Sequence, residues 1–441
     1  MSNSKPYLQL FAEHRALVDQ NSCAAMNAHR DEAAKILEQK GLPLRKDERY
    51  RYFDVQGAFA PDFGVNLQRA LPSVNPYEVY RCNVPNLSTS LCFVVNDTPI
   101  LPAHNHFEAE GIKVACLKEN SEFIADFYNR AVHDADAVAA LNTMLAQDGL
   151  LIYVPAHVKT KNPIQLVNVC DANHAMLSNR RLLVVVEEGA EAQILICDHV
   201  AGRQPYLTTQ VAEVFAQENS KVELYTIEEG ASNVTKFAHF YIQQQAGSQV
   251  TMNGVTLHAG QTHNQVNVRL MGEHAQVFTG GAVIAGGQEV VDDNIVVEHV
   301  APNCNSKMLY KYVLDDHSVS AFAGKVLVQP DAQHTLSEQT NANLCVVPTA
   351  HAYAQPMLEI YADDVKCNHG STVGKLDESA LFYMRQRGIS EQEARLLLQY
   401  AFVNEVLQHV EIEYLRERLA HLVEMRFRGE ANTCDGCKIC K

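Results

Sequence analysis

The chain has 441 residues, of which 47% are apolar and 20% are charged, and its formal net charge is -16. This length allows two or three structural units or one elongated domain, and the composition is typical of a folded protein. Surfaces that bind nucleic acid are basic, so the acidic balance argues against a nucleic-acid partner. No apolar run reaches membrane-spanning length and no charged-then-apolar leader is recognised, so we expect a cytoplasmic protein that contacts no membrane.

Residues 1–148 are predicted to form a helical and mixed region. Phe11 and Val18 fit one apolar helical face, and a second helical run ends at Gly41 with Pro43 behind it, as helices commonly do. The first sixty residues are therefore expected to be mainly helical.

The second half of this region is expected to mix strands and helix. Short apolar runs at 91–95 and 112–117 predict strands, whereas residues 123–145 predict one helix. His104 and His106 form an H-x-H motif in a loop that contains Pro and Asn, which favours a solvated turn over a metal site.

Residues 149–376 show apolar and polar residues in alternation, interrupted by turns, which predicts strands with almost no helix. In one recurring turn, a Gly, Asn or Asp that tolerates positive φ precedes two or three small or polar residues and then a strand. Its five copies begin at Glu188, Glu218, Ala246, Met271 and Pro330, and the first four copies are 30, 28 and 25 residues apart. Such a period in β sequence predicts a solenoid, whose coils bury their inward faces by stacking.

A parallel β-helix explains why consecutive strands, such as 250–257 and 266–270, have no helix between them. A β-propeller has a longer repeat, and a β-sandwich, the main rival, does not explain the recurring turn. The last coil of a solenoid has unpaired backbone groups, so its own chain or a partner must cover it.

Several polar residues in this region are interpreted mainly as structural or surface residues, and the alternative that a few of the histidines line an internal route along the β-helix to the junction with a partner stays open. Asp292 and Asp293 are neighbours that face opposite sides of a strand, as are Asp363 and Asp364, so neither pair predicts an acid–base dyad. A further set lies near expected turns, where imidazoles are usually surface residues. These residues are His258, His263, His274, His299, Cys304, His317 and His334.

The stretch from Gln355 to Gly374 forms the expected last coil, and it carries Cys367 and His369. A thiol and an imidazole two residues apart on a strand point to the same face, so both can reach one soft or borderline metal ion. This spacing alone favours a packed cysteine beside a solvated histidine.

This stretch, QPMLEIYADDVKCNHGSTVG, and the segment after it, LDESALFYMRQRGIS, closely resemble the signature of the SufD family. SufD proteins are scaffold subunits of the SUF iron–sulfur cluster assembly machinery. The resemblance implies a mainly β fold, in which a right-handed parallel β-helix is flanked by N-terminal and C-terminal α-helical regions. It also implies pairing with the paralogue SufB, with cluster assembly at that junction. His369, with Cys367 as a second ligand, would then hold iron or a nascent cluster transiently, in a site shared with the partner.

Residues 377–430 are predicted to be helical. Asp377 can cap one helix, and Ser390 and Glu393 form a capping box for the next. A small amphipathic bundle that caps the solenoid is enough to explain these helices. The family resemblance adds docking of the ATPase SufC, for which the expected contact residues are Leu381, Phe382, Tyr383, Arg385, Arg387 and Gly388.

The sequence H-G-S-T-V-G-K-L, which begins at His369, is not a phosphate loop. Only three residues separate its glycines, and Leu376 follows Lys375 where Mg²⁺ binding needs Ser or Thr. We therefore expect that this chain binds no nucleotide and that any ATP hydrolysis belongs to a partner.

The twelve cysteines do not suggest a disulfide framework, because nine are scattered singly through apolar segments, which predicts reduced thiols. The other three, Cys434, Cys437 and Cys440, lie in residues 431–441. Their spacing suits zinc or iron–sulfur ligation, but three thiolates leave a tetrahedral site incomplete. A flexible tail is the favoured interpretation, and a metal or redox role stays open.

The favoured hypothesis is a non-catalytic scaffold subunit. Its rivals are an exported β-helix enzyme that acts on carbohydrate, which the missing leader and the absence of Trp disfavour, and a purely structural solenoid. A SufB paralogue is a near alternative, although the C-x-H-G motif matches SufD. Whether the isolated chain forms a homodimer stays open.

Overall fold

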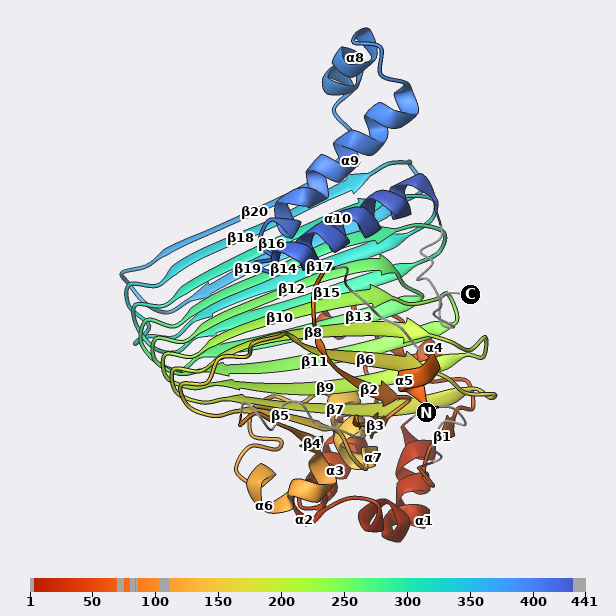
Figure 1. Cartoon of the computed structure of the whole chain (residues 1–441), viewed down its shortest axis with the longest axis vertical. Helices are drawn as coiled ribbons and strands as arrows, with labels where there is room; N and C mark the ends of the chain where they lie inside the picture. Colours follow the sequence, from red (N-terminus) through yellow and green to blue (C-terminus); the bar gives the residue numbers. More distant parts are fainter. Residues whose placement is uncertain (1–3, 70–74, 80–83, 85, 103–110, 431–441) are drawn as a thin grey trace.

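The computed structural model describes residues 4–69, 75–79, 84, 86–102 and 111–430. Two ten-stranded sheets form its body, with helices from the N-terminal region at one end and helices from the C-terminal region at the other (Figure 1). The predicted mainly β fold, a stack of parallel coils between helical ends, is confirmed, and the stack has about eight turns.

The N-terminal region begins with helices, as its sequence predicts. The helix α3 ends at Gly41, whose φ of 64° only glycine adopts without strain. The helices and short turns of this region are α1 (Lys5–Gln20), α2 (Ala24–Asn27), α3 (Arg30–Lys40), η1 (Glu48–Tyr50), α4 (Val55–Ala58), α5 (Pro76–Val79), η3 (Leu117–Asn120), α6 (Ser121–Ile124) and α7 (Ala137–Leu145).

The predicted single helix over 123–145 is wrong. Asn129 and Asp134 have positive φ, at 61° and 49°, and these conformations interrupt a helix. The chain re-enters helix only at α7, where the side chain of Asp136 accepts hydrogen bonds from the backbone N–H groups of Val138 and Ala139.

The two runs predicted as strands do form strands. The first is β2 (Ser90–Val95), which pairs in parallel with the solenoid and turns back into β3 (Thr98–Ile100). The second is β4 (Lys113–Cys116), which pairs antiparallel with β5, and β1 (Gly64–Val65) pairs with β7. The N-terminal region thus starts both sheets.

Consecutive strands of the solenoid alternate between the two sheets, so that each coil contributes one strand to each. The odd sheet contains β5 (Leu150–Val154), β7 (Met176–Val186), β9 (Tyr206–Ala216), β11 (Val234–Gln244), β13 (Gln261–Leu270), β15 (Val290–His299), β17 (Val319–Val328) and β19 (His351–Ile360). The even sheet contains β6 (Ile164–Cys170), β8 (Glu191–Val200), β10 (Lys221–Glu229), β12 (Gln249–His258), β14 (Gln276–Ala285), β16 (Asn305–Leu314), β18 (Leu336–Cys345) and β20 (Lys366–Gly374).

Six successive corners from the odd sheet to the even sheet share one backbone feature. Each has a residue with positive φ two positions before the next strand, and the residue between is buried and small or polar. The positive-φ residues are Gly189, Asn219, Gly247, His274, Asn303 and His334, and the buried ones are Ala190, Ser220, Ser248, Ala275, Cys304 and Thr335.

The predicted turns are confirmed at Gly189, Asn219 and Gly247. In the fourth and fifth copies the residue with positive φ is a histidine, His274 or His334, and not the Gly or Asp that the sequence suggests. Those corners are longer, spanning 271–275 and 329–335 where the first spans 187–190. The residue with positive φ therefore keeps a fixed distance from the next strand. In a longer corner it lies further from the start of the turn.

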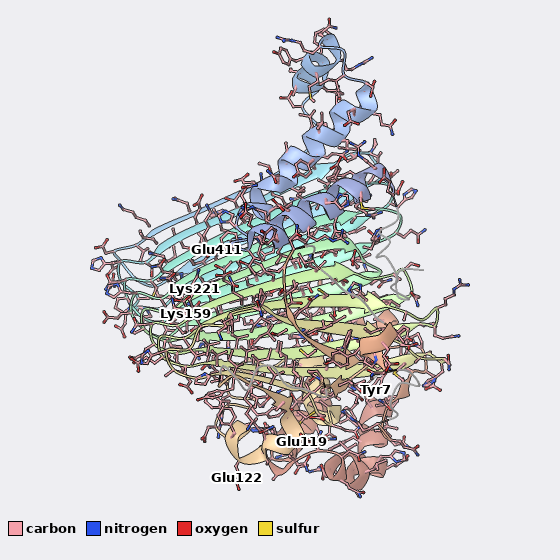
Figure 2. All side chains as sticks on the ribbon, viewed as in Figure 1. Tyr7, Glu119, Glu122, Lys159, Lys221 and Glu411 are labelled. Carbon is pink, nitrogen blue, oxygen red and sulfur yellow. The ribbon has the colours of Figure 1, made fainter. Side chains whose placement is uncertain are left out.

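Side chains on each strand alternate between the space inside the coils and the outer faces. The inner faces of both sheets share one apolar core, which includes Ile295 and Phe322. The helices α1, α3 and α7 cover the start of the odd sheet, whereas α9 (Glu391–Leu407) and α10 (Glu413–Arg428) lie across the even sheet (Figure 1). An ion pair of 2.6 Å between Lys221 and Glu411 fastens the link between these two helices to β10 (Figure 2).

The solenoid ends on β19 and β20, which we call the open end. Within the described residues, β19 pairs only with β17 and β20 pairs only with β18. The helix α8 (Glu378–Gln386) follows β20 and projects beyond the coils (Figure 1). Both terminal strands therefore present a free row of backbone N–H and C=O groups, which favours pairing with another strand.

No helix among the described residues is both long and apolar enough to cross a membrane.

Candidate functional site at the open end

The site predicted from Cys367 and His369 lies on β20, the last strand of the even sheet. Cys367 is half-buried and packs against the apolar core between the sheets. His369 is two residues further along the strand, so its side chain leaves from the same inner face, and it is exposed. The structure thus places both groups at the mouth of the space enclosed by the coils.

The two groups differ in how readily they ligate a metal. Burial raises the pKa of the Cys367 thiol, and only the thiolate is a strong ligand. The imidazole of His369 is exposed, and an imidazole binds a metal through a ring nitrogen without first becoming an anion. His369 is therefore the better ligand of the pair until a partner changes the surroundings of the sulfur.

The described residues do not by themselves complete a metal site at the open end. Across the described residues, no group of three or more His, Cys, Asp or Glu side chains is arranged to hold a metal ion. A four-coordinate ion bound by Cys367 and His369 would need two further ligands, from a partner or from solvent.

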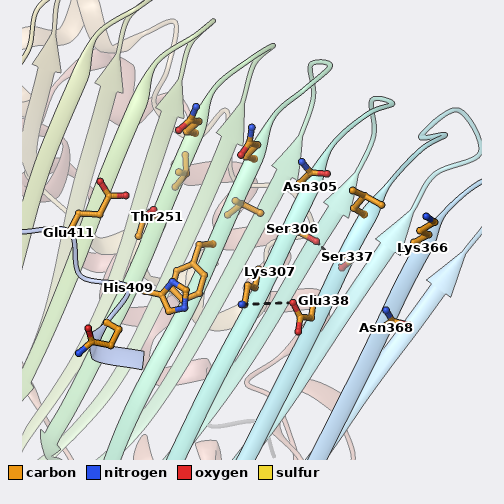
Figure 3. A pocket seen from close by; sticks show the side chains of 17 residues that line it. Thr251, Asn305, Ser306, Lys307, Ser337, Glu338, Lys366, Asn368, His409 and Glu411 are labelled. Carbon is orange, nitrogen blue, oxygen red and sulfur yellow. Dashed lines mark hydrogen bonds and ion pairs between the residues drawn. The ribbon is translucent and has the colours of Figure 1, made fainter. Parts of the chain in front are cut away.

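The outer face beside these residues forms a groove of about 800 Å³. Asn368, between the two candidate ligands, lines this groove at the free edge, with Lys307 and Glu338 paired at 3.8 Å on neighbouring strands (Figure 3). His409, which follows α9, stacks on Phe278 with ring centroids 4.1 Å apart and forms the groove's other wall. The alternation along β20 thus separates this polar groove from the inward-facing ligands.

The predicted contact surface for an ATPase lies on α8 and is largely exposed. Phe382 is 64% exposed and Tyr383 is 59% exposed, which is unusual for aromatic residues without a partner. Arg387 donates a hydrogen bond of 2.8 Å to the Tyr383 hydroxyl, and Arg385 pairs with Glu391 at 3.3 Å.

Two of the residues predicted to contact the ATPase have structural roles in the helix instead. Leu381 is buried, and Gly388 ends the helix with a φ of 87°. Asp377 caps α8 and Ser390 caps α9, as predicted, but the Glu393 carboxylate pairs with Arg428 at 3.1 Å. The reciprocal half of the expected capping box is thus replaced by an ion pair to α10.

Three residues expected at surface turns are buried, so that prediction is wrong for them. His263 is covered by the part of the N-terminal region around Tyr50, which we call the N-terminal segment. The two rings stack with centroids 4.3 Å apart. His299 and Cys304 are buried at a corner of the coil, and the pKa of His299 is lowered to about 4 by burial. The imidazole of His299 therefore stays neutral near pH 7.

Asp292 and Asp293 face opposite sides of their strand, as predicted, whereas Asp363 and Asp364 lie in the corner between β19 and β20 and not on a strand. Asp292 faces outward to His263, and Asp293 faces inward. Asp364 lies in the corner after β19, where it pairs with His334 at 3.0 Å. His104 and His106, and the tail with Cys434, Cys437 and Cys440, lie outside the described residues. All eight described cysteines are free.

A buried polar cluster, which no sequence pattern indicated, ties the N-terminal segment to the solenoid. The Tyr50 hydroxyl donates a short hydrogen bond to the Asp136 carboxylate, which also contacts His239 Nε2 at 3.1 Å. Burial alone would raise the pKa of Asp136, but His239 and the Tyr50 hydroxyl lower it below its usual value. The cluster thus holds a charged carboxylate under the N-terminal segment.

A small cavity of about 50 Å³ lies between the sheets in the middle coils. Gly254 and Gly281, neighbours in register on β12 and β14, line it without side chains. Lys236 bonds to Asp198 at 2.5 Å and to Glu228 at 3.4 Å beside it. The alternation of apolar and polar residues along these strands does not indicate which inward-facing positions are charged.

The fold and the open end together define a class of protein: a parallel β-solenoid with helical ends, whose free final coil carries an inward-facing cysteine and histidine. Residues 168–402 match the family model described as the SUF system FeS cluster assembly, SufBD core domain, and residues 1–166 match the SufBD protein N-terminal region.

Among known proteins, the chain is 27% identical to an iron–sulfur cluster assembly SufBD family protein of Synechocystis over 94% of both chains. It is 26% identical to the iron–sulfur cluster assembly protein SufD of Escherichia coli, over 89% of this chain and 90% of that one. It is 23% identical to SufD of Bacillus subtilis, over 71% and 73%. The chain belongs to the SufBD family of the SUF iron–sulfur cluster assembly system, and it is SufD-like.

Proposed function

We propose that this protein is a non-catalytic scaffold subunit of a SUF complex. Its open end pairs with a SufB-like subunit, and α8 receives a SufC-like ATPase. His369, assisted by Cys367, presents ligands to iron or a nascent cluster, which is the cargo of the site. The observation that carries this proposal is the free final coil with its two inward-facing ligands.

The chemistry of the open end supports pairing with a related solenoid. Two parallel strands end the stack with free backbone groups, and a partner coil of like geometry would satisfy them. Exposed apolar side chains surround these strands, and burying them would favour association. They are Leu336, Tyr353, Ile360, Tyr361 and Val373.

The ligand set supports transient binding. A neutral imidazole releases a metal when it is protonated, and a thiol that is costly to ionise binds weakly without help. A second subunit that supplies the missing ligands makes loading depend on the complex. The family match favours this scaffold hypothesis over a carbohydrate-active enzyme and over a purely structural solenoid.

Co-purification with SufB-like and SufC-like partners tests the proposal. The wild-type chain should co-elute with both, and Val373→Glu at the free edge should remove the SufB-like subunit, because pairing would bury an unpaired carboxylate. Leu44→Glu, at an exposed apolar residue of the N-terminal segment, is the matched control and should leave the complex intact. A Val373→Glu chain that still binds the SufB-like subunit would place the junction with that subunit away from the open end.

A further inference from the structure

The space between the sheets becomes more polar toward the open end. On β16 the inward-facing residues include Met308, Tyr310 and Tyr312, which belong to the apolar core. On β18 the inward-facing residues are polar throughout most of the strand and are nevertheless buried. These residues are Ser337, Gln339, Asn341 and Asn343.

One of these carboxamides is held in a fixed orientation. Gln339 is 1% exposed, and its Nε2 donates a hydrogen bond of 3.0 Å to the carbonyl oxygen of Gly324 on β17, in the opposite sheet. A side chain at position 324 would prevent this contact, because a Cβ there would lie 2.0 Å from Gln339 Nε2. The glycine therefore makes room for the amide, and the bond fixes its nitrogen.

The oxygen of the same amide has no partner. Gln339 Oε1 is buried and accepts no hydrogen bond from any described residue. An acceptor left in this state costs about 1–3 kcal/mol, so a donor that arrives at this position is stabilising. The oxygen of Asn341 differs, since it accepts from Asn343 at 2.6 Å and from Ser371 at 3.3 Å, whereas the oxygen of Asn343 is also buried without a partner among the described residues.

His369 is the residue beside Gln339 in the register of β18 and β20. Adjacent strands lie about 4.8 Å apart, and both side chains leave from the inner face, so the amide oxygen is within reach of the imidazole. Among the described residues, no hydrogen bond to the His369 ring is formed. A histidine that ligates a metal through one ring nitrogen almost always donates the other N–H to an acceptor.

We propose that Gln339 is the positioning residue for His369. Its Oε1 accepts the N–H of the ring nitrogen that does not bind iron or the cluster, while its Nε2 stays on Gly324. This bond selects one tautomer and one ring orientation, so that the other nitrogen faces the junction. The inference rests on the proposed function, because it assigns a role to Gln339 only if His369 is the ligand.

The test measures Co²⁺ binding to the complex of the full chain with its SufB-like and SufC-like partners, using the visible absorption of the ion. Gln339→Met, and the smaller Gln339→Ala, should weaken binding by about 10- to 100-fold, the usual loss when a ligand histidine loses its acceptor. The matched control is Gln265→Met, because Gln265 is also buried with unpartnered amide atoms but lies on β13, away from the open end. The control should bind Co²⁺ as the wild type does.

A second readout reports the ring itself. In protein labelled with ¹⁵N only at histidine, the NMR signals of the His369 ring nitrogens are identified by their absence in His369→Ala. These signals should show one tautomer in the wild type and a mixture of tautomers in Gln339→Met. Unchanged Co²⁺ affinity and an unchanged tautomer in Gln339→Met, with binding lost in His369→Ala, overturn this inference alone. Wild-type affinity in His369→Ala overturns it together with the proposed function.

Discussion

Asp292 and Asp293 are neighbours on β15, yet their carboxyl groups lie on opposite sides of the odd sheet. Asp292 contacts His263 Nδ1 at 3.2 Å outside the coils, under the N-terminal segment. Asp293 lies between the sheets, where it accepts hydrogen bonds of 2.5 Å from Tyr312 and 2.8 Å from Asn264. The pleat of the strand thus gives one carboxylate an imidazole partner outside the coils and the other only neutral donors inside them.

Asp293→Asn should make the stability of the protein less sensitive to pH. Burial raises the pKa of Asp293 to about 6, although the bonds from Tyr312 and Asn264 oppose the shift. The folded state therefore holds this proton more tightly than the unfolded chain, whose Asp pKa is about 3.9, and stability is lost as pH rises through 6. Between pH 4 and pH 7 the variant should gain about 2–3 kcal/mol relative to wild type, as measured by urea unfolding at each pH. A difference that stays constant over this range would contradict the assignment.

Asp136→Asn should show the opposite dependence. Burial opposes the charge of Asp136, but His239 and Tyr50 lower its folded-state pKa below the unfolded value. Its contribution is therefore complete near pH 7 and is lost as the solution becomes more acidic than pH 4. We expect a loss of about 3 kcal/mol at pH 7 in urea unfolding, because one partner of a buried charged cluster is removed. The exposed Asp31, in a surface pair with Arg15, provides the control, and Asp31→Asn should cost much less.

Gly281→Ala should destabilise the middle coils. A Cβ at this position would lie 2.6 Å from the ring of Tyr310, inside the core. Overpacking of this kind costs about 1–3 kcal/mol, which urea unfolding can measure. Gly374→Ala, where a Cβ would meet no atom within 4 Å, is the control and should be nearly neutral. Equal losses of stability in the two variants would show that the inner face accommodates an added methyl group more easily than its packing indicates.

The double substitution Phe382→Ser and Tyr383→Ser should weaken binding of the SufC-like ATPase by about tenfold or more, because exposed aromatic residues are common anchors of interfaces. Both side chains are exposed, so folding should be unaffected. Isothermal titration calorimetry gives the affinity, and circular dichroism checks the helix content. Tyr414→Ser, at an exposed aromatic residue on α10, is the control. Retained affinity in the double variant would move the ATPase contact away from α8.

The solenoid was predictable because its signals are local. Alternation along each strand and the residues Gly189, Asn219 and Gly247 at the corners follow from short-range backbone preferences. The exposure of His369 also followed, since the last coil of any solenoid lacks a neighbour.

Burial at particular positions depends on contacts between distant parts of the chain, which periodicity does not contain. His263 was expected at the surface, but Tyr50 and Phe53 from the N-terminal segment cover it. No sequence pattern singled out Gln339, because the hydrogen bond that fixes its side chain goes to Gly324 in the opposite sheet. Pairings of this kind become visible only when the coils are stacked.

The central claim is that His369 holds iron or a nascent cluster at a junction with a SufB-like subunit. The most direct measurement is the iron content of the purified three-subunit complex after reconstitution, compared between wild type and His369→Ala. We predict that the variant assembles the complex as the wild type does but retains little iron. A variant complex with the same iron content as wild type would contradict the account.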